Sequence, residues 1–148
     1  TDRLGEPATT PKAGRGAAFA DLDNDGDIDI VINNVNDTPD LFRTDRAANA
    51  GHWVTFSLTG TTSNRNAIGA RVRISVGRET QLDEVRGGGS YYAQNDFRAH
   101  FGIGAATVVD RVEVRWLNGL EESWDHVAAD QFVKLKEGSG TALPNATP

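Results

Sequence analysis

Polar and apolar residues alternate with a period of two along most of the chain, and this pattern restricts the possible folds more than any other feature. Val54, Phe56 and Leu58 share one face of an extended segment. The same alternation recurs at residues 28–33, 70–76, 112–116 and 133–136. Successive side chains of a β-strand point to opposite faces of a sheet, so such alternation is typical of strands with one buried face. We therefore predict an all-β chain, folded as an antiparallel β-sandwich or a small barrel.

The segments between the predicted strands carry turn residues. Asn118-Gly119 follows the strand at 112–116 and predicts a tight type I′ hairpin, in which both residues have a positive φ. Val127 to Asp130 is the one stretch that indicates a helical turn. From residue 138 onward the chain is rich in Gly, Ser, Thr, Pro and Ala, and we predict a flexible tail there.

Most of the excess negative charge lies in one loop. Residues 21–29 read D-L-D-N-D-G-D-I-D, with five Asp in nine positions, and without them the net charge of −6 would be −1. The 15 Lys and Arg residues are scattered and form no basic stripe, so we expect no nucleic-acid partner. The chain has no Cys, which excludes disulfides and thiolate metal sites, and no apolar run near the roughly 20 residues of a membrane-spanning helix.

The acidic loop has the spacing of a calcium site. Ca²⁺ binds six to eight oxygen ligands, and a glycine at the sixth position of such a loop permits a sharp turn. The predicted ligands are the carboxylates of Asp21, Asp23, Asp25 and Asp29 and the backbone carbonyl of Asp27. An EF-hand would carry Glu at the position of Ile32 and continue as a helix, whereas this loop runs into an apolar strand. The alternative is a solvated acidic cluster without an ion.

A second group of polar residues follows the apolar strand at 28–33. Asn34, Asn36, Asp37 and Asp40 predict either another ion site or a turn shaped by Asn and Asp side chains.

Two parts of the chain resemble known families. Residues 16–30, G-A-A-F-A-D-L-D-N-D-G-D-I-D-I, resemble an FG-GAP (VCBS-type) repeat, the calcium-loop hairpin of integrin-like β-propellers. Four later segments together resemble the ASPIC/UnbV domain: S-N-R-N-A-I-G-A-R-V (63–72), E-V-R-G-G-G-S-Y-Y-A-Q-N-D (84–96), H-F-G-I-G (100–104) and V-E-V-R-W (112–116). This domain follows FG-GAP repeats in cartilage-acidic-protein-like proteins and in many bacterial secreted proteins. Those proteins carry several repeats and this chain has one, so the resemblance implies the C-terminal part of a longer protein.

The predicted organisation has five parts. These are an irregular arm (1–15), the calcium-loop hairpin (16–43), a linker (44–51), the ASPIC/UnbV-like β-domain (52–137) and the flexible tail (138–148). Because an isolated hairpin is marginally stable in water, we expect the hairpin to dock on the β-domain.

Two polar, turn-rich segments of the predicted β-domain are candidates for binding a polar ligand such as a sugar, because loops on a rigid sheet often carry binding residues. The candidate residues are Asn64, Arg65, Tyr91, Asn95 and Asp96. The alternative is that Asn and Gly only shape these turns and that Arg65 pairs with a carboxylate such as Asp96.

Patterns of enzyme chemistry do not occur. Ser90 lies in G-G-S-Y-Y, and a nucleophile elbow would need Gly at the position of Tyr92. The three histidines lack the spacing of a metal-binding pair, and we expect His100 to be a structural strand residue.

The sequence therefore predicts a noncatalytic, Ca²⁺-binding recognition or adhesion module that binds a glycan or an extracellular protein. It is expected to be extracellular, secreted or periplasmic, because weak carboxylate loops bind Ca²⁺ only where the ion is abundant. The pattern predicts no particular oligomeric state. Two alternatives remain: an accessory domain of a larger secreted or biosynthetic enzyme, and a structural cap of a β-propeller.

Overall fold

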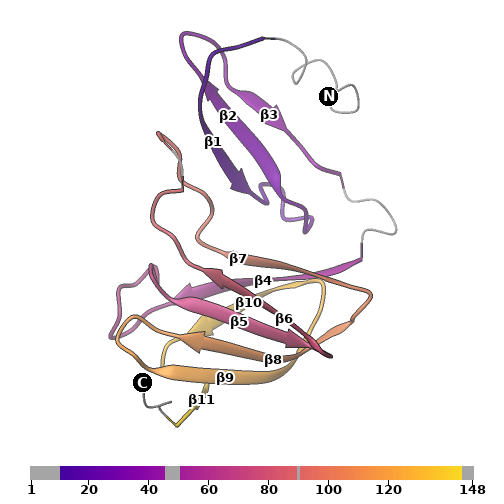
Figure 1. Cartoon of the computed structure of the whole chain (residues 1–148), viewed down its shortest axis with the longest axis vertical. Coiled ribbons are helices and arrows are strands. Elements are labelled where there is room, and N and C mark those ends of the chain that lie inside the picture. Colours follow the sequence, from indigo (N-terminus) through magenta and orange to yellow (C-terminus); the bar gives the residue numbers. More distant parts are fainter. Residues whose placement is uncertain (1–10, 46–50, 90, 145–148) are drawn as a thin grey trace. The chain divides into compact units, whose positions relative to one another are not determined.

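The computed structural model describes residues 11–45, 51–89 and 91–144, and the prediction of an all-β chain is confirmed (Figure 1). The strands are β1 (Gly14–Ala20), β2 (Asp29–Asn34), β3 (Asp40–Phe42), β4 (His52–Thr59), β5 (Arg71–Val76), β6 (Glu79–Glu84), β7 (Ala99–Gly104), β8 (Val108–Arg115), β9 (Glu121–Ala128), β10 (Gln131–Lys136) and β11 (Thr141–Ala142). These ranges contain no helix, and therefore no helix that is long and apolar enough to cross a membrane.

The chain divides into two compact units. The first lies within residues 1–47 and 87–96, and the second within residues 48–86 and 97–148. The connection between β6 and β7 therefore leaves the second unit, contributes to the first and returns.

The second unit is a sandwich of two sheets, with strand orders β10-β4-β7 and β11-β9-β8-β5-β6. Its core contains Val54 and Phe56 from the first sheet and Val72, Ile74 and Val112 from the second, all at most 1% exposed. These are the apolar positions of the alternating segments, so burial of one face explains the pattern. All pairings are antiparallel except the pairing of β10 with β4, which is parallel.

The turn between β8 and β9 differs from the predicted type I′ turn. Gly119 has a φ of +90°, but Asn118 does not have a positive φ. The N–H of Gly119 donates to the carbonyl of Trp116 (3.0 Å), and the N–H of Trp116 donates to the carbonyl of Leu120 (2.8 Å), so the loop has three residues, 117–119. The side chain of Asn118 accounts for this geometry, since its Oδ1 accepts the N–H of Leu120 (3.0 Å) while its Nδ2 donates to Glu137 (2.6 Å).

Two further predictions near the C-terminus are wrong. Val127 and Ala128 continue β9 instead of starting a helical turn, because they pair with Val109 and Val108 of β8. Residues 138–144 are not a flexible tail: the N–H groups of Gly138 (3.0 Å) and Gly140 (2.8 Å) donate to the buried carboxylate of Glu122, and β11 pairs with β9. Residues 145–148 of the predicted tail lie outside the described residues.

Glu137, immediately after β10, holds the loop that follows β4. Its side chain is buried, and its Oε2 accepts the backbone N–H groups of Thr61, Thr62 and Ser63 at 2.6, 2.9 and 2.9 Å. Its Oε1 accepts the hydroxyl of Thr62 (2.6 Å) and the amide of Asn118 (2.6 Å). Burial alone would raise the pKa of Glu137, but these hydrogen bonds outweigh it and lower the pKa to about 2.

The first unit is the three-stranded antiparallel sheet β1-β2-β3. Phe19, Ile30 and Phe42 lie opposite one another across the three strands and form an apolar row. Phe19 is 43% exposed, and no residue of this row is buried. The buried residues described in this unit are glycines and polar residues, so the sheet has no apolar core there.

Residues 91–96 contact the outer edge of β1. The N–H of Asp96 donates to the carbonyl of Phe19 (3.1 Å), and Oδ1 of Asn95 accepts the N–H of Phe19 (3.1 Å). A Cβ at Gly16 would lie 2.2 Å from the carbonyl oxygen of Tyr91, so this close approach requires glycine. A segment that the sequence assigned to the β-domain thus covers an open strand edge of the hairpin.

Gly16→Ala tests this contact. The added methyl group overlaps backbone and forces residues 91–96 away from β1, at a cost of about 1–3 kcal/mol. We expect the amide of Asp96 to exchange with solvent at least about tenfold faster in hydrogen-exchange NMR. Gly14→Ala is the matched control, because its Cβ would meet Ile32 at an ordinary 3.4 Å. Equal protection of Asp96 in the two variants would contradict the contact.

Glu137→Gln tests the buried carboxylate. Glutamine replaces one accepting oxygen with an NH₂ group, which then faces the N–H and O–H donors that surround Glu137. We expect a loss of unfolding free energy on the order of 3 kcal/mol at pH 7. Since the pKa of Glu137 is lowered to about 2 from 4.5, its contribution is complete above pH 4.5 and is lost as the pH falls towards 2. The deficit of the variant, measured by urea unfolding at several pH values, should therefore shrink across this range. The exposed variant Glu79→Gln should follow the wild type throughout, and a deficit of Glu137→Gln that is independent of pH would refute the assignment.

Candidate functional site

Three carboxylates converge where β1 leads into β2. Asp21 follows the end of β1, Asp23 lies in the loop, and Asp29 is the first residue of β2. One carboxylate oxygen of each lies within 4.8 Å of those of the other two. Asp21 and Asp29 are 3% and 1% exposed, whereas Asp23 is open to solvent. The cluster thus has two buried carboxylates and one at the surface.

Backbone N–H groups hold the two buried carboxylates in place. Asp21 accepts the N–H of Asp25 (3.1 Å) and of Gly26 (3.0 Å), which folds the loop around it. Gly26 has a φ of +94°, a conformation that glycine adopts without strain. Asp29 accepts one N–H on each oxygen, from Leu22 (3.0 Å) and from Thr44 (2.8 Å).

The donor set fits a hard divalent cation. Carboxylate oxygens are the ligands that Ca²⁺ prefers, and three of them in one loop leave room for backbone carbonyls and water among its six to eight ligands. Asp21, Asp23 and Asp29 are the residues that would hold the ion. Asp25, predicted as a ligand, lies outside this group, and its Oδ1 accepts the N–H of Asp27 (2.9 Å).

Two residues that sequence spacing did not indicate contact the cluster. Arg43 follows β3, and its Nε lies 3.0 Å from Oδ2 of Asp23; its Nη2 also pairs with Asp45 (3.1 Å). Thr44 donates to Asp29 and, through its hydroxyl, to the carbonyl of Ile28 (3.1 Å). The pairing of β3 with β2 brings these residues to the loop, so no local signal around residue 21 could have revealed them.

The polar group after β2 forms a turn that a lysine closes. Asn34 donates to the carbonyl of Thr38 (2.8 Å) and to Asp40 (2.9 Å). Nζ of Lys12 lies 2.5 Å from Oδ1 of Asp40, and this hydrogen bond lowers the pKa of Asp40. The positive charge that faces Asp40 in this turn is therefore supplied by Lys12.

The predicted ligand residues are divided between the two units. Asn64 and Arg65 belong to the second unit, and Tyr91, Asn95 and Asp96 belong to the first. The side-chain amide of Asn64 closes its own loop, donating to the carbonyl of Ile68 (2.8 Å) and accepting its N–H (2.8 Å). Arg65 is exposed and has no side-chain partner among the described residues.

The candidates of the first unit lie beside β1. Asn95 and Asp96 make the contacts with Phe19 described above. Tyr91 is 62% exposed, and its ring meets that of Tyr92 edge to face with centroids 4.3 Å apart. Ser90 lies outside the described residues.

Two histidines of the second unit, His52 on β4 and His100 on β7, have side-chain partners. Nδ1 of His100, on β7, lies 2.8 Å from Oγ1 of Thr55, and its ring stacks on Trp53. His52 lies 2.6 Å from Asp130.

Comparison with known families agrees with this architecture. The profile described as ASPIC and UnbV matches residues 60–142, from the loop after β4 to the end of β11. A comparison with curated proteins finds no match. The matched segment exceeds half of the 148 residues and contains most strands of the sandwich. On this basis the chain belongs to the ASPIC and UnbV family.

Proposed function

We propose that this chain is a noncatalytic, calcium-binding extracellular module for recognition or adhesion. The observation that carries this proposal is the convergence of Asp21, Asp23 and Asp29 within 4.8 Å, with two of the three carboxylates buried. Like charges so close together repel one another, and a bound cation removes that repulsion. A site of this kind with few charged ligands binds weakly, which favours an extracellular location where Ca²⁺ is abundant.

We further propose that the hairpin is the last FG-GAP repeat of a longer protein of the cartilage-acidic-protein-like kind. The apolar row Phe19, Ile30 and Phe42 supports this, because no residue of the row is buried. A sheet with an open apolar face gains stability from a neighbouring sheet, as the blades of a propeller do. The same observation favours the second candidate function, a structural cap that closes the edge of a β-propeller.

A calcium titration of the melting temperature tests the metal site. Ca²⁺ at 100 times its dissociation constant should stabilise the folded chain by about 2.7 kcal/mol. Asp23→Asn should remove most of this gain, since it deletes the one solvent-facing carboxylate of the cluster. Because Asp23 has its described ion pair only with Arg43, the variant should otherwise fold normally.

Asp27→Asn is the matched control. It removes one negative charge from the same loop and keeps both the backbone carbonyl and the three convergent carboxylates, so the gain with Ca²⁺ should persist. Mg²⁺ should give a smaller gain in the wild type, because it retains its bound water. Equal losses in both Asp variants, or no effect of Ca²⁺ on the wild type, would sink the proposal.

Glycan-array and matrix-protein binding tests the recognition role. Arg65 is exposed and has no side-chain partner among the described residues, so Arg65→Ala should leave the melting temperature unchanged. If Arg65 belongs to a recognition surface, binding of the glycan or protein hit should fall about tenfold, as for a moderate interface residue. Glycans or proteins that bind the wild type and the variant equally would show that the recognition surface does not include the loop of Arg65.

A further inference from the structure

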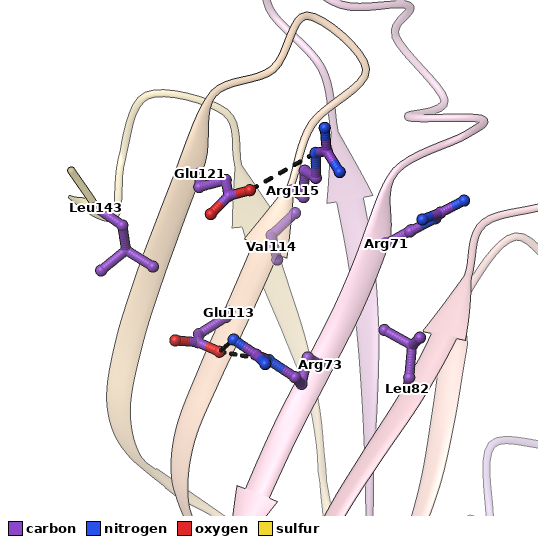
Figure 2. A pocket seen from close by; sticks show the side chains of 8 residues that line it. All are labelled: Arg71, Arg73, Leu82, Glu113, Val114, Arg115, Glu121 and Leu143. Atoms are coloured by element: carbon purple, nitrogen blue, oxygen red, sulfur yellow. Dashed lines mark hydrogen bonds and ion pairs between the residues drawn. The ribbon is translucent and has the colours of Figure 1, made fainter. Parts of the chain in front are cut away.

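An open groove of about 360 Å³ crosses the outer face of the five-stranded sheet in the second unit (Figure 2). Its volume lies in the range of small-ligand sites. The groove makes no use of the aspartate loop and is independent of the calcium proposal.

Strand register explains how the groove forms. One row of outward-facing side chains consists of Glu121, Arg115 and Arg71, which lie opposite one another on β9, β8 and β5. The neighbouring row contains Glu113, Arg73 and Leu82, on β8, β5 and β6. The residue between the two rows on β8, Val114, is buried in the core, so backbone forms the floor of the groove.

The arginines of the two rows differ in how fully they are paired. Arg73 makes two contacts with Oε2 of Glu113, from Nε (2.6 Å) and Nη2 (2.5 Å). Arg71 donates one hydrogen bond, from Nε to Glu84 (3.2 Å), and Nε of Arg115 lies 3.6 Å from Glu121. Among the described residues, the terminal nitrogens of Arg71 and Arg115 donate no hydrogen bond.

Arg71 and Arg115 are directly opposite one another on paired strands. Like charges in this position destabilise a sheet, and an anion that both guanidinium groups contact reverses the effect. Carboxylates recognise guanidinium groups through paired, charge-assisted hydrogen bonds, so they suit this site.

The other walls restrict the class of anion. Leu82, beside Arg73 and close to Arg71, is 66% exposed and offers an apolar surface. Glu113 and Glu121 also line the groove, so polyanions such as nucleic acids and sulfated polysaccharides meet repulsion there. A single negative charge on an apolar body fits both features.

We propose that this groove binds a small monocarboxylate, with its carboxylate between Arg71 and Arg115 and its apolar part against Leu82. The interaction is reversible binding, and no covalent step is involved. A ligand with about eight heavy atoms that fits this site binds in the millimolar range.

Titration of the ¹⁵N-labelled full chain with sodium hexanoate, followed by NMR, tests the proposal. The amide signals of residues 71–73, 82 and 113–115 should shift and reach saturation by about 20 mM hexanoate, because this concentration exceeds the millimolar dissociation constant expected. Acetate, which lacks the apolar body, and hexanol, which lacks the charge, should each bind at least about fivefold more weakly. Shifts that are absent, scattered over the surface or equally strong with hexanol overturn the proposal.

Matched variants locate the charge. Arg71→Gln and Arg115→Gln should each weaken hexanoate binding about tenfold, a change of about 1.4 kcal/mol. Both side chains are more than half exposed, so the variants should fold, which the unperturbed amide spectrum checks. Arg78→Gln, at the exposed turn between β5 and β6, removes the same charge outside the groove and should bind normally. Equal affinity in all three variants would show that the arginine pair does not hold the carboxylate.

Discussion

Buried carboxylates that accept backbone N–H groups hold the connections in both units. Asp21 and Asp29 fix the loop between β1 and β2, while Glu122 and Glu137 fix the chain around β10 and β11. A buried charge is costly unless hydrogen bonds replace its water, and among the described residues no buried side-chain nitrogen or oxygen lacks a partner. Hydrogen bonds from backbone N–H groups to a few buried carboxylates therefore order these loops.

The number of hydrogen bonds that each carboxylate accepts separates the structural carboxylates from the candidate metal ligands. Glu137 accepts three backbone N–H groups on Oε2 alone, and hydroxyl and amide groups surround Oε1. Asp29 accepts one N–H on each oxygen, which leaves a lone pair on each for a further interaction. Asp23 has one described ion pair and faces solvent. This difference explains why the acidic loop suits a cation and the Glu137 loop does not.

The arginines on the outer face of the five-stranded sheet also differ in how fully they are paired. Arg73 contacts Oε2 of Glu113 through two nitrogens, while Arg71 donates one hydrogen bond to Glu84 and Nε of Arg115 lies 3.6 Å from Glu121. A β-sheet sets the spacing of such side chains through register, so the arginine pair follows from the alignment of β5 with β8. The family match covers these strands, and all the residues that line the groove except Leu143 lie within the matched segment.

Local patterns determined the strands and the acidic loop, because a period of two and the spacing of Asp around Gly26 depend only on near neighbours in the chain. They predicted the all-β sandwich and the crowding of carboxylates in this loop, of which Asp21, Asp23 and Asp29 converge and Asp25 does not. Long-range pairing decided the rest. It made β10 parallel to β4, ordered residues 138–144 against β9, and brought Arg43 and Thr44 to the loop. The turn at Asn118 is a three-residue loop in which the side-chain amide of Asn118 donates to Glu137, a residue of another turn. Such contacts have no signal in local sequence, since each exists only after distant strands have packed.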